Sequence, residues 1–562
     1  MKKIVSLFLT LCMLLSLSFS FAEELKDTWT PDDYTAAADI RTETASDFTG
    51  KTVILHSNDV HGQIDGYALI AGLRTYFQDL GATVILADMG DFSQGDPAVN
   101  LSRGENAVEM MNAAKYDVAT LGNHEFIYGY DQLTQNLSKA TFSVLCANVR
   151  LEKTGKLLYP ATKMIEPESG LKLGFFGLAT PETVRKVNPA LIKSLTFSQG
   201  DELYRDAQEA VDSLEGADLI IGLTHLGVDE ESREAGYRSL DLYRNVKGID
   251  LLLDGHSALT MTVCENGEPI QSTGTKFAAI GVVVIDNETK VIEDRYLLPT
   301  ALGSKLFSFV PVDPDVRNVS DTIISYVDTI YGTAFATSEA ELNGERNPGV
   351  RTEETNMGDL IAESMIWYVV KEGGLEQAEP NAVVGIVNGG CIRASIHVGD
   401  VTRNDINKVL PFGNTVSVTY VKGSELLEVL EASTFNSPEA FAGFPQTSGI
   451  EWTLDTTKPY DAGEVYIRDG QPTDYNAPAS INRVTISKIN GEPFDPEATY
   501  ALVTNDYCAV GGDTYNVLAN CSYTFDTGVA MDVALIGYIQ DVLEGKIPAD
   551  YANPKGNLTI IQ

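Results

Sequence analysis

Histidine, aspartate and asparagine residues recur in this chain where apolar runs give way to polar loops. Five of the six histidines lie at such points. Asp59 and His61 follow the run TVILHSN two residues apart, so in an extended backbone both side chains face the same side. Carboxylate, amide and imidazole groups together suit divalent ions such as zinc or manganese, rather than the thiolate zinc sites of small structural domains.

Four further loops, after the runs TVILADM, DVATLG, LIIGLT and IDLLLD, carry the same residue types. Glycine stands beside the candidate ligand in three of them, which permits the tight backbone path that such a loop needs. A single histidine at a strand end is most often an ordinary residue that is hydrogen-bonded to the backbone. The same arrangement of polar residues after five apolar runs, however, predicts that these residues form a cluster. The candidate metal ligands are Asp59, His61, Asp91, Asn123, His225 and His256.

The elements that position these residues are predicted from the apolar runs. Runs of four to six β-branched or leucine residues indicate strands buried on both faces of a sheet. From Lys51 to about Pro299 they alternate with helical patterns such as Asp201–Leu214, which is typical of an α/β or α/β/β layered domain. Polar residues at the carboxyl ends of neighbouring strands then meet at one edge of the sheet. His56 lies inside its strand and is expected to pack there, and His397 fits no such pattern.

A chain of 562 residues is too long for a single hydrophobic core. An amphipathic segment from Val316 to Tyr331 is a candidate interdomain helix. Beyond it we predict a helix from about Asn356, strands near 382–387, 415–421 and 500–504, and a helix after Lys422. The predicted division is a signal peptide (1–22), an exposed lead-in (23–50), a first domain (51–312), a linker helix (313–333) and a second domain (334–562).

Composition restricts where the protein works and what it binds. Lys2 and Lys3, the apolar stretch that follows and the small residue Ala22 predict a cleaved signal peptide, so we expect export to a periplasmic, extracellular or cell-surface location. No later run is apolar enough to span a bilayer. The net charge of −39 argues against binding of nucleic-acid polymers. Cys508 and Cys521 could pair, or all the cysteines could be buried free thiols. The oligomeric state is not predicted.

The motifs SNDVHG, MGDFSQG, GNHEF, THLG and DGHS resemble the calcineurin-like metallophosphoesterase signature, in an order similar to that of the 5′-nucleotidase family. In the second half, NMGDLI, NGGCIR, LPFGNT, QTSGI and NDYCAVGGD follow that family's order. The resemblance covers nearly the whole mature chain. It implies a four-layer α/β/β/α metallophosphoesterase domain, joined by a linker helix to a C-terminal α/β nucleotide-specificity domain.

The resemblance also implies two divalent metal ions, zinc, manganese or similar, bridged by Asp91. One ion would bind Asp59 and His61, and the other would bind the remaining candidate ligands. A water molecule activated by the metals would attack phosphorus. His124 would stabilise the charge that develops on the phosphoryl group or protonate the leaving oxygen.

Two positions depart from the family pattern. The family's motif usually continues GNHEFD, with an aspartate that pairs with the catalytic histidine, and here Ile127 stands in its place. Ala258 stands where a further ligand to the first ion is usual. We therefore expect an active enzyme that is slower or more demanding of metal than its relatives, unless another residue such as Glu125 or Asp131 replaces the missing carboxylate.

The second domain supplies candidate substrate-binding residues at family positions. Phe412 and Tyr507 could stack a base between two rings, although phenylalanine is more usual at position 507. Arg351 and Arg393 could bind phosphate or carboxylate groups. Contacts to ribose and base are expected from Asn388, Asn414, Gly449 and Asp513. By resemblance, this site faces the metals across the domain interface, and a hinge near the linker helix allows closure and product release.

The resemblance thus implies an exported, metal-dependent phosphoric monoester hydrolase acting on nucleoside 5′-monophosphates. The motifs do not separate this activity from a UDP-sugar hydrolase or a 2′,3′-cyclic nucleotide phosphodiesterase. The alternative of another class is a nucleotide-binding protein with impaired catalysis. Ile127 and Ala258 are its only support, and the retained candidate ligands oppose it.

Overall fold

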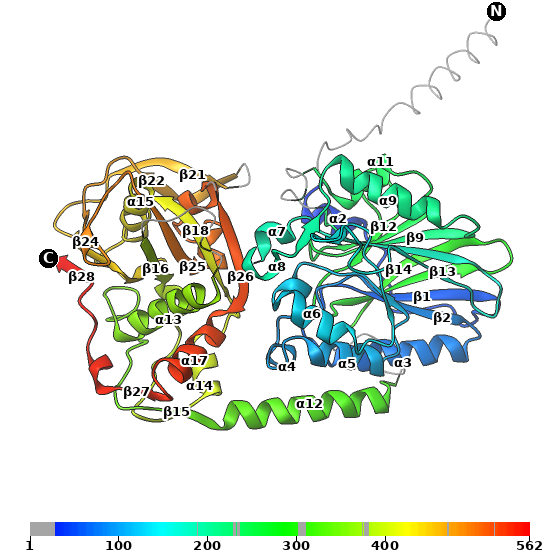
Figure 1. Cartoon of the computed structure of the whole chain (residues 1–562), viewed down its shortest axis with the longest axis horizontal. Helices are drawn as coiled ribbons and strands as arrows, with labels where there is room; N and C mark the ends of the chain where they lie inside the picture. Colours follow the sequence, from blue (N-terminus) through cyan, green and yellow to red (C-terminus); the bar gives the residue numbers. More distant parts are fainter. Residues whose placement is uncertain are drawn as a thin grey trace, which may run out of the picture.

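The computed structural model describes residues 29–187, 189–228, 232, 236–301, 311–373, 375, 382–468, 471–521 and 523–562. Two domains lie side by side and are joined along one edge by helix α12 (Pro314–Gly332) (Figure 1). The predicted signal peptide, residues 1–22, lies outside the described residues. Among the described residues no helix combines the length and apolar character needed to cross a membrane.

Two six-stranded sheets form the centre of the N-terminal domain. The first has the order β14 (Val291–Pro299), β13 (Ala279–Asp286), β1 (Lys51–Ser57), β2 (Thr83–Asp88), β3 (Val118–Ala119), β4 (Ser143–Val144). The second has the order β11 (Thr260–Met261), β12 (Ile270–Thr273), β10 (Leu251–Asp254), β9 (Leu219–His225), β7 (Leu173–Ala179), β6 (Thr162–Ile165). Strands β1, β2 and β3 run parallel, as do β7, β9, β10 and β12. Their carboxyl ends therefore lie at one edge.

The two sheets pack face to face, and helices cover both outer faces. Ile54, Ile85, Phe175, Ile221 and Leu251 are buried between the sheets. The first sheet is covered by α3 (Gly66–Asp79), α5 (Glu105–Ala113) and α6 (Gly129–Leu137), and the second by α9 (Asp201–Ser213) and α11 (Ser239–Asn245). Shorter elements are α4 (Pro97–Asn100), β5 (Val149–Leu151), α7 (Thr183–Lys186), α8 (Pro189–Ile192) and β8 (Leu195–Phe197). The predicted α/β/β/α layering is confirmed.

Most residues of the described segment before β1, residues 29–50, are exposed, but the segment is attached to the domain at a few points. It contains α2 (Pro31–Ala37), which starts with a capping box at Thr30. Tyr34 is 2% exposed and packs into the core of the second sheet, and Phe48 is 3% exposed in the core of the first. Arg41 bonds to Asp294 on β14. Residues 29–50 are thus mostly exposed, and Tyr34, Phe48 and Arg41 attach the segment to the two sheets of the domain.

The C-terminal domain contains a five-stranded sheet in the order β19 (Pro445–Ser448), β16 (Ala382–Asn388), β25 (Thr499–Asn505), β18 (Thr415–Lys422), β26 (Thr524–Ala530). One face packs against α13 (Asn356–Glu372), α14 (Arg403–Val409) and α17 (Met531–Asp541). The other face packs against α15 (Gly423–Ser433) and a sheet of β24 (Glu492–Pro493), β23 (Val484–Ile489), β20 (Ile450–Asp455) and β28 (Leu558–Ile561). The remaining strands are β15 (Ala334–Ser338), β17 (Gly399–Thr402), β27 (Lys546–Ile547), β21 (Ala462–Arg468) and β22 (Gln471–Pro478), and α16 (Asp506–Ala509) follows β25.

In the described part of the chain, two regions make extensive contacts between the domains. Helix α12 packs against α3, α4 and α5 of the N-terminal domain and against α14 of the C-terminal domain. Away from α12, helix α7 of the N-terminal domain lies against β26 of the C-terminal domain (Figure 1). There the backbone of Gly528 approaches Ile127 so closely that a Cβ atom at residue 528 would lie 2.2 Å from Ile127 Cγ1.

Candidate active site

The ends of five parallel strands bring the predicted ligands into one cluster. His225 Nε2 lies 3.0 Å from Asp91 Oδ2 and 3.9 Å from Asp59 Oδ1. His61 Nε2 lies 3.9 Å from both carboxylates. Two sets of three residues could each hold a cation, because within each set the potential ligand atoms all lie within 4.8 Å of one another. Asp91 belongs to both sets. The sets are His61, Asp91 and His124, and Asp91, His225 and His256.

Two observations show that these residues fit a bound cation. Asn123 Oδ1 is buried and has no hydrogen-bond partner among the described residues. Burial opposes protonation of His225, yet the carboxylates of Asp91 and Asp59 raise its pKa to about 10. Positive charge is therefore favoured at this point, and a divalent cation would replace the proton. The donor set of imidazole, carboxylate and amide oxygen is one that zinc or manganese accepts.

Neighbouring charges keep Asp91 ionised. Burial alone would raise the pKa of its carboxyl group, but His225, His124 and His61 outweigh burial and hold the pKa well below its usual range. The side chain is also fixed in place, because Asp91 Oδ1 accepts a 2.9 Å hydrogen bond from the His124 backbone amide. Asp91 is thus an ionised, oriented carboxylate, which suits a ligand shared by two cations.

The ligand loops adopt strained backbone conformations. Asp59, His61, Asp91 and His256 have φ angles of 49°, 45°, 60° and 78°, in the left-handed region that favours glycine. The loops are held by each other, since the Asp59 amide donates to the Gly90 carbonyl and the His61 amide donates to the Asp91 carbonyl, both at 3.0 Å. Such strain persists where the surroundings over-determine the backbone, which is typical of functional sites.

Glu125 fixes two of these loops at once. Its buried carboxylate accepts hydrogen bonds of 2.7–3.0 Å from four backbone amides, those of Asp91, Phe92, Ser93 and Gly122. It therefore does not replace the missing carboxylate partner of His124. Asp131, the other suggested replacement, is exposed on α6. The acceptor for His124 is instead Gln94, whose Oε1 lies 2.7 Å from His124 Nδ1.

A hydrogen bond to the second ring nitrogen orients the other histidines of the cluster. His225 Nδ1 lies 2.5 Å from the Met89 carbonyl, and His256 Nε2 lies 2.9 Å from Glu182 Oε2. Such partners set the tautomer and raise the basicity of a ligating imidazole. Glu182, like Gln94, was missed by sequence reasoning. It follows the carboxyl end of β7, so the rule that found the ligands could also have found it.

The two departures from the family pattern have different outcomes. Ala258 is exposed at the surface of its loop with φ 52° and offers no side-chain ligand. Ile127 is 1% exposed, within the apolar core and against Gly528.

The two histidines outside the cluster have no ligand role. His56 is buried, and burial lowers its pKa to about 3. Both of its ring nitrogens lack hydrogen-bond partners among the described residues. His397 is exposed and bonds to Glu341. The five cysteines after the predicted signal peptide are free thiols.

A cavity of about 310 Å³ in the C-terminal domain collects seven of the eight predicted substrate-binding residues. They are Arg351, Asn388, Arg393, Phe412, Asn414, Tyr507 and Asp513. Gly449 is not among its lining residues. That residue lies between β19 and β20, and its carbonyl accepts a 2.9 Å hydrogen bond from the Asn490 amide. We refer to this cavity as the C-terminal pocket.

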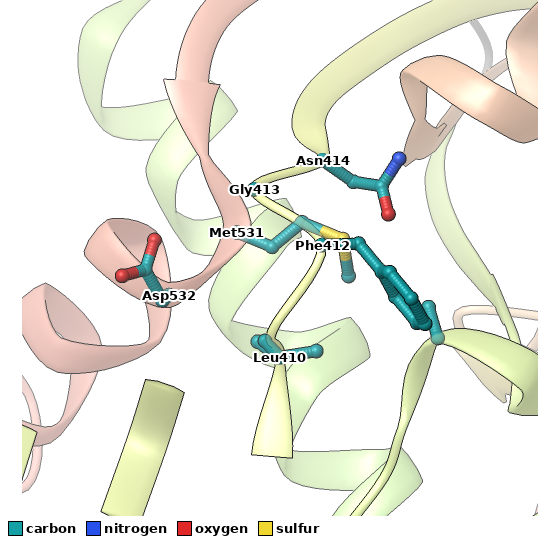
Figure 2. A pocket seen from close by; sticks show the side chains of 7 residues that line it. Leu410, Phe412, Gly413, Asn414, Met531 and Asp532 are labelled. Carbon is teal, nitrogen blue, oxygen red and sulfur yellow. The ribbon is translucent and has the colours of Figure 1, made fainter. Parts of the chain in front are cut away.

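The two rings of the C-terminal pocket are exposed. Phe412 is 60% exposed and Tyr507 is 43% exposed. Phe412 and Asn414 project to the same side of their loop, and Asp532 lies on the other side (Figure 2). The Tyr507 hydroxyl donates to Asp513 Oδ1 at 3.1 Å, and Asn388 Nδ2 donates to Asp513 Oδ2 at 3.1 Å. The pocket thus presents flat apolar faces next to an oriented carboxylate.

Two arginines, Arg351 and Arg393, line the C-terminal pocket, and Arg346 adds positive charge near Arg351. Burial, together with the charges of Arg346 and Arg393, lowers the pKa of Arg351. Arg351 Nε is buried without a hydrogen-bond partner among the described residues, and the Arg393 guanidinium lies 5.5 Å from the centre of the Phe412 ring. Mutually repelling cations in so acidic a chain favour an anionic ligand. Arg346 was missed by sequence reasoning, although it lies only five residues before Arg351.

Comparison with known proteins agrees with this arrangement. Residues 52–259 match the family described as calcineurin-like phosphoesterase, and residues 334–520 match the family described as 5′-nucleotidase, C-terminal domain. The chain is 29% identical over 523 residues to the trifunctional nucleotide phosphoesterase protein YfkN of Bacillus subtilis, covering 84% of this chain but only 33% of that protein. It is 27% identical over 559 residues to a 5′-nucleotidase of Vibrio vulnificus, covering 90% of this chain and 93% of that protein.

A solved structure has the same arrangement of elements. The crystal structure of the 5′-nucleotidase precursor from Thermus thermophilus matches with a TM-score of 0.51 and 26% identity, covering 91% of this chain and 99% of that one. Both halves of the chain, and not the N-terminal domain alone, therefore have counterparts in proteins of this kind.

Proposed function

Because the chain belongs to the 5′-nucleotidase family of calcineurin-like metallophosphoesterases, we propose that it is an exported two-metal enzyme that removes phosphate from nucleoside 5′-monophosphates. The observation that carries the proposal is the shared position of Asp91. Its carboxylate belongs to two adjacent sets of ligand atoms, and neighbouring imidazoles keep it ionised. A single bridging carboxylate is how two-metal hydrolases keep their ions close together.

The ligands divide between two ions. Asp59 and His61 with Asp91 would hold the first, and Asn123, His225 and His256 with Asp91 would hold the second. When bound, the ions supply an activated water and stabilise charge on the attacking and leaving oxygens. Because Ala258 adds no ligand, three protein ligands would hold the first ion, which is sufficient for a catalytic site but would bind the ion more weakly.

The chain's own residues orient the substrate. Arg351 and Arg393 would bind its phosphate groups, and Phe412 and Tyr507 would stack on the base. Asp513 is positioned to accept hydrogen bonds from ribose hydroxyls. His124, 3.8 Å from Asp91 Oδ2 through its Nε2, is placed to stabilise the phosphoryl group or to give a proton to the leaving oxygen.

The two sites belong to different domains, so a change in domain orientation is part of the proposal. All six predicted metal ligands lie between residues 59 and 256, whereas the C-terminal pocket is lined by residues 351–513. The two domains are connected by α12, and among the described residues α7 and Ile127 also lie against β26. A substrate bound in the C-terminal pocket would reach the metals by rotation about the end of α12, and the reverse movement would release product.

The test is product formation from three compounds by the exported holoenzyme. AMP, UDP-glucose and 2′,3′-cyclic AMP are each incubated with protein as purified, after chelation, and after re-addition of manganese or zinc. We expect adenosine and phosphate from AMP, with activity lost on chelation and restored by the metal. Preferred cleavage of UDP-glucose or 2′,3′-cyclic AMP would show that the protein has that activity instead. No product from any of them, with AMP still bound tightly, would establish an impaired nucleotide-binding protein instead.

A further inference from the structure

Gln94 contacts two histidines of the cluster with two different groups. Its backbone carbonyl lies 3.1 Å from His61 Nδ1, and its side-chain Oε1 lies 2.7 Å from His124 Nδ1. The two rings meet edge to face with centroids 4.8 Å apart. The Nε2 atoms of both rings lie 3.8–3.9 Å from Asp91 Oδ2. One residue therefore holds both imidazoles that approach Asp91 from this side.

The loop that carries Gln94 is fixed on both sides of it. The Ser93 amide donates to Glu125 at 3.0 Å, while Asn100 clamps both the amide and the carbonyl of Gly95 at 2.9 Å. At Gly95 a Cβ atom would lie 2.3 Å from the His61 carbonyl oxygen, so the loop passes directly over His61. The side chain of Gln94, which is 5% exposed, is consequently aimed at His124 by a rigid backbone.

The nearby carboxylates are committed elsewhere. Glu125 accepts four backbone amides, and Glu182 bonds to His256. Ile127 occupies the position next to the histidine loop with an apolar side chain packed against Gly528 of the other domain. Gln94 Oε1 is therefore the side-chain oxygen bonded to His124 Nδ1 in the described part of the chain.

We infer that Gln94 is the positioning residue for His124: its amide oxygen fixes the orientation and tautomer of the imidazole so that Nε2 faces Asp91 and the phosphoryl group. An amide oxygen can only accept, so Nδ1 carries the proton. Unlike a carboxylate, the amide adds no negative charge to a cluster that already holds Asp59 and Asp91 and must admit a phosphate. The inference rests on the proposed function, since it concerns the same site.

Kinetics of phosphate release from AMP test this role. Gln94→Met keeps the length of the side chain and removes the acceptor. It should lower kcat by about 10- to 100-fold, the usual effect of losing a partner of an active-site histidine, with KM within about threefold and the metal content unchanged. Gln94→Glu keeps an acceptor and should retain kcat within several-fold of wild type. Gln135→Met, at an exposed position of α6, is the matched control and should behave as wild type.

A double variant shows whether Gln94 acts through His124. If it does, Gln94→Met should cost nothing further in a His124→Ala background, because the interaction is already gone. Wild-type kcat in Gln94→Met overturns the inference, as does a loss that is explained by lost metal or that adds fully to His124→Ala. Failure of the proposed function is distinguishable, because the wild-type enzyme would then release no phosphate in the same assay.

Discussion

The metal cluster and the C-terminal pocket are built in opposite ways. Asp59 and Asp91 are 1% and 2% exposed, and their loops are fixed by cross-bonded backbones and by Glu125. In the C-terminal pocket, Phe412 and Tyr507 stand 60% and 43% exposed. Burying charged groups costs folding free energy, but groups that are held rigidly in place can stabilise a transition state, which suits catalysis. Exposed rings become buried only when a ligand packs against them, which suits recognition. We therefore expect substitutions at the cluster to affect turnover and substitutions at the C-terminal pocket to affect substrate binding.

The largest effect is expected at the shared ligand. Asp91→Asn removes the charge that both sets of ligands use, so both ions should be lost and phosphate release should fall by about a thousandfold or more. Metal content by elemental analysis and phosphate release from AMP check this expectation. Retention of two ions with near-normal turnover would show that Asp91 does not bridge them.

The second effect tests the rigidity of the cluster. Glu125→Gln replaces a carboxylate that accepts four amides by a group with one acceptor oxygen, so buried amides lose partners at a cost of about 1–3 kcal/mol each. We expect the free energy of unfolding to fall by about 2–4 kcal/mol and metal affinity to fall about tenfold. Denaturant unfolding and metal titration measure both. Glu109→Gln, on the exposed face of α5, is the control and should change neither quantity.

The third effect belongs to the C-terminal pocket. Phe412→Ala removes a stacking face worth about 1–3 kcal/mol, so KM for AMP should rise by about 10- to 100-fold. Turnover at saturating AMP and the metal content should stay near wild type, since the ring lies outside the cluster. A fall in kcat with unchanged KM would mean that the pocket takes part in the chemical step, and the contrast between the two regions would fail.

The smallest effect concerns the hydroxyl that distinguishes Tyr507 from phenylalanine. Tyr507→Phe keeps the stacking face and removes the hydrogen bond to Asp513, which contributes about 0.5–1.5 kcal/mol. KM for AMP should rise about two- to tenfold without a change in kcat. Equal KM values for the two proteins would show that Asp513 is held well enough by Asn388 alone.

The rule for strand ends was sufficient to predict that the candidate ligands lie close together, because it places each of them at the same edge of parallel strands. The partners of the ligands could not be predicted in this way. Glu182 and His256 are 74 residues apart and meet only once β7 and β10 lie in one sheet. Gln94 reaches His124 through the path of a loop, which apolar periodicity does not describe. The same limit explains Tyr34, an isolated aromatic residue whose burial depends on a surface formed by distant strands.

We expect the N-terminal cluster to cleave phosphate esters whatever their alcohol, and the C-terminal pocket to select nucleotides. The most direct test compares kcat/KM for AMP and for glycerol 3-phosphate, which has no base, in wild type and in Phe412→Ala/Tyr507→Ala. In the double variant, kcat/KM should fall by about 100-fold or more with AMP and should stay within about threefold of wild type with glycerol 3-phosphate. An equal loss with both substrates, or no loss with AMP, would contradict it.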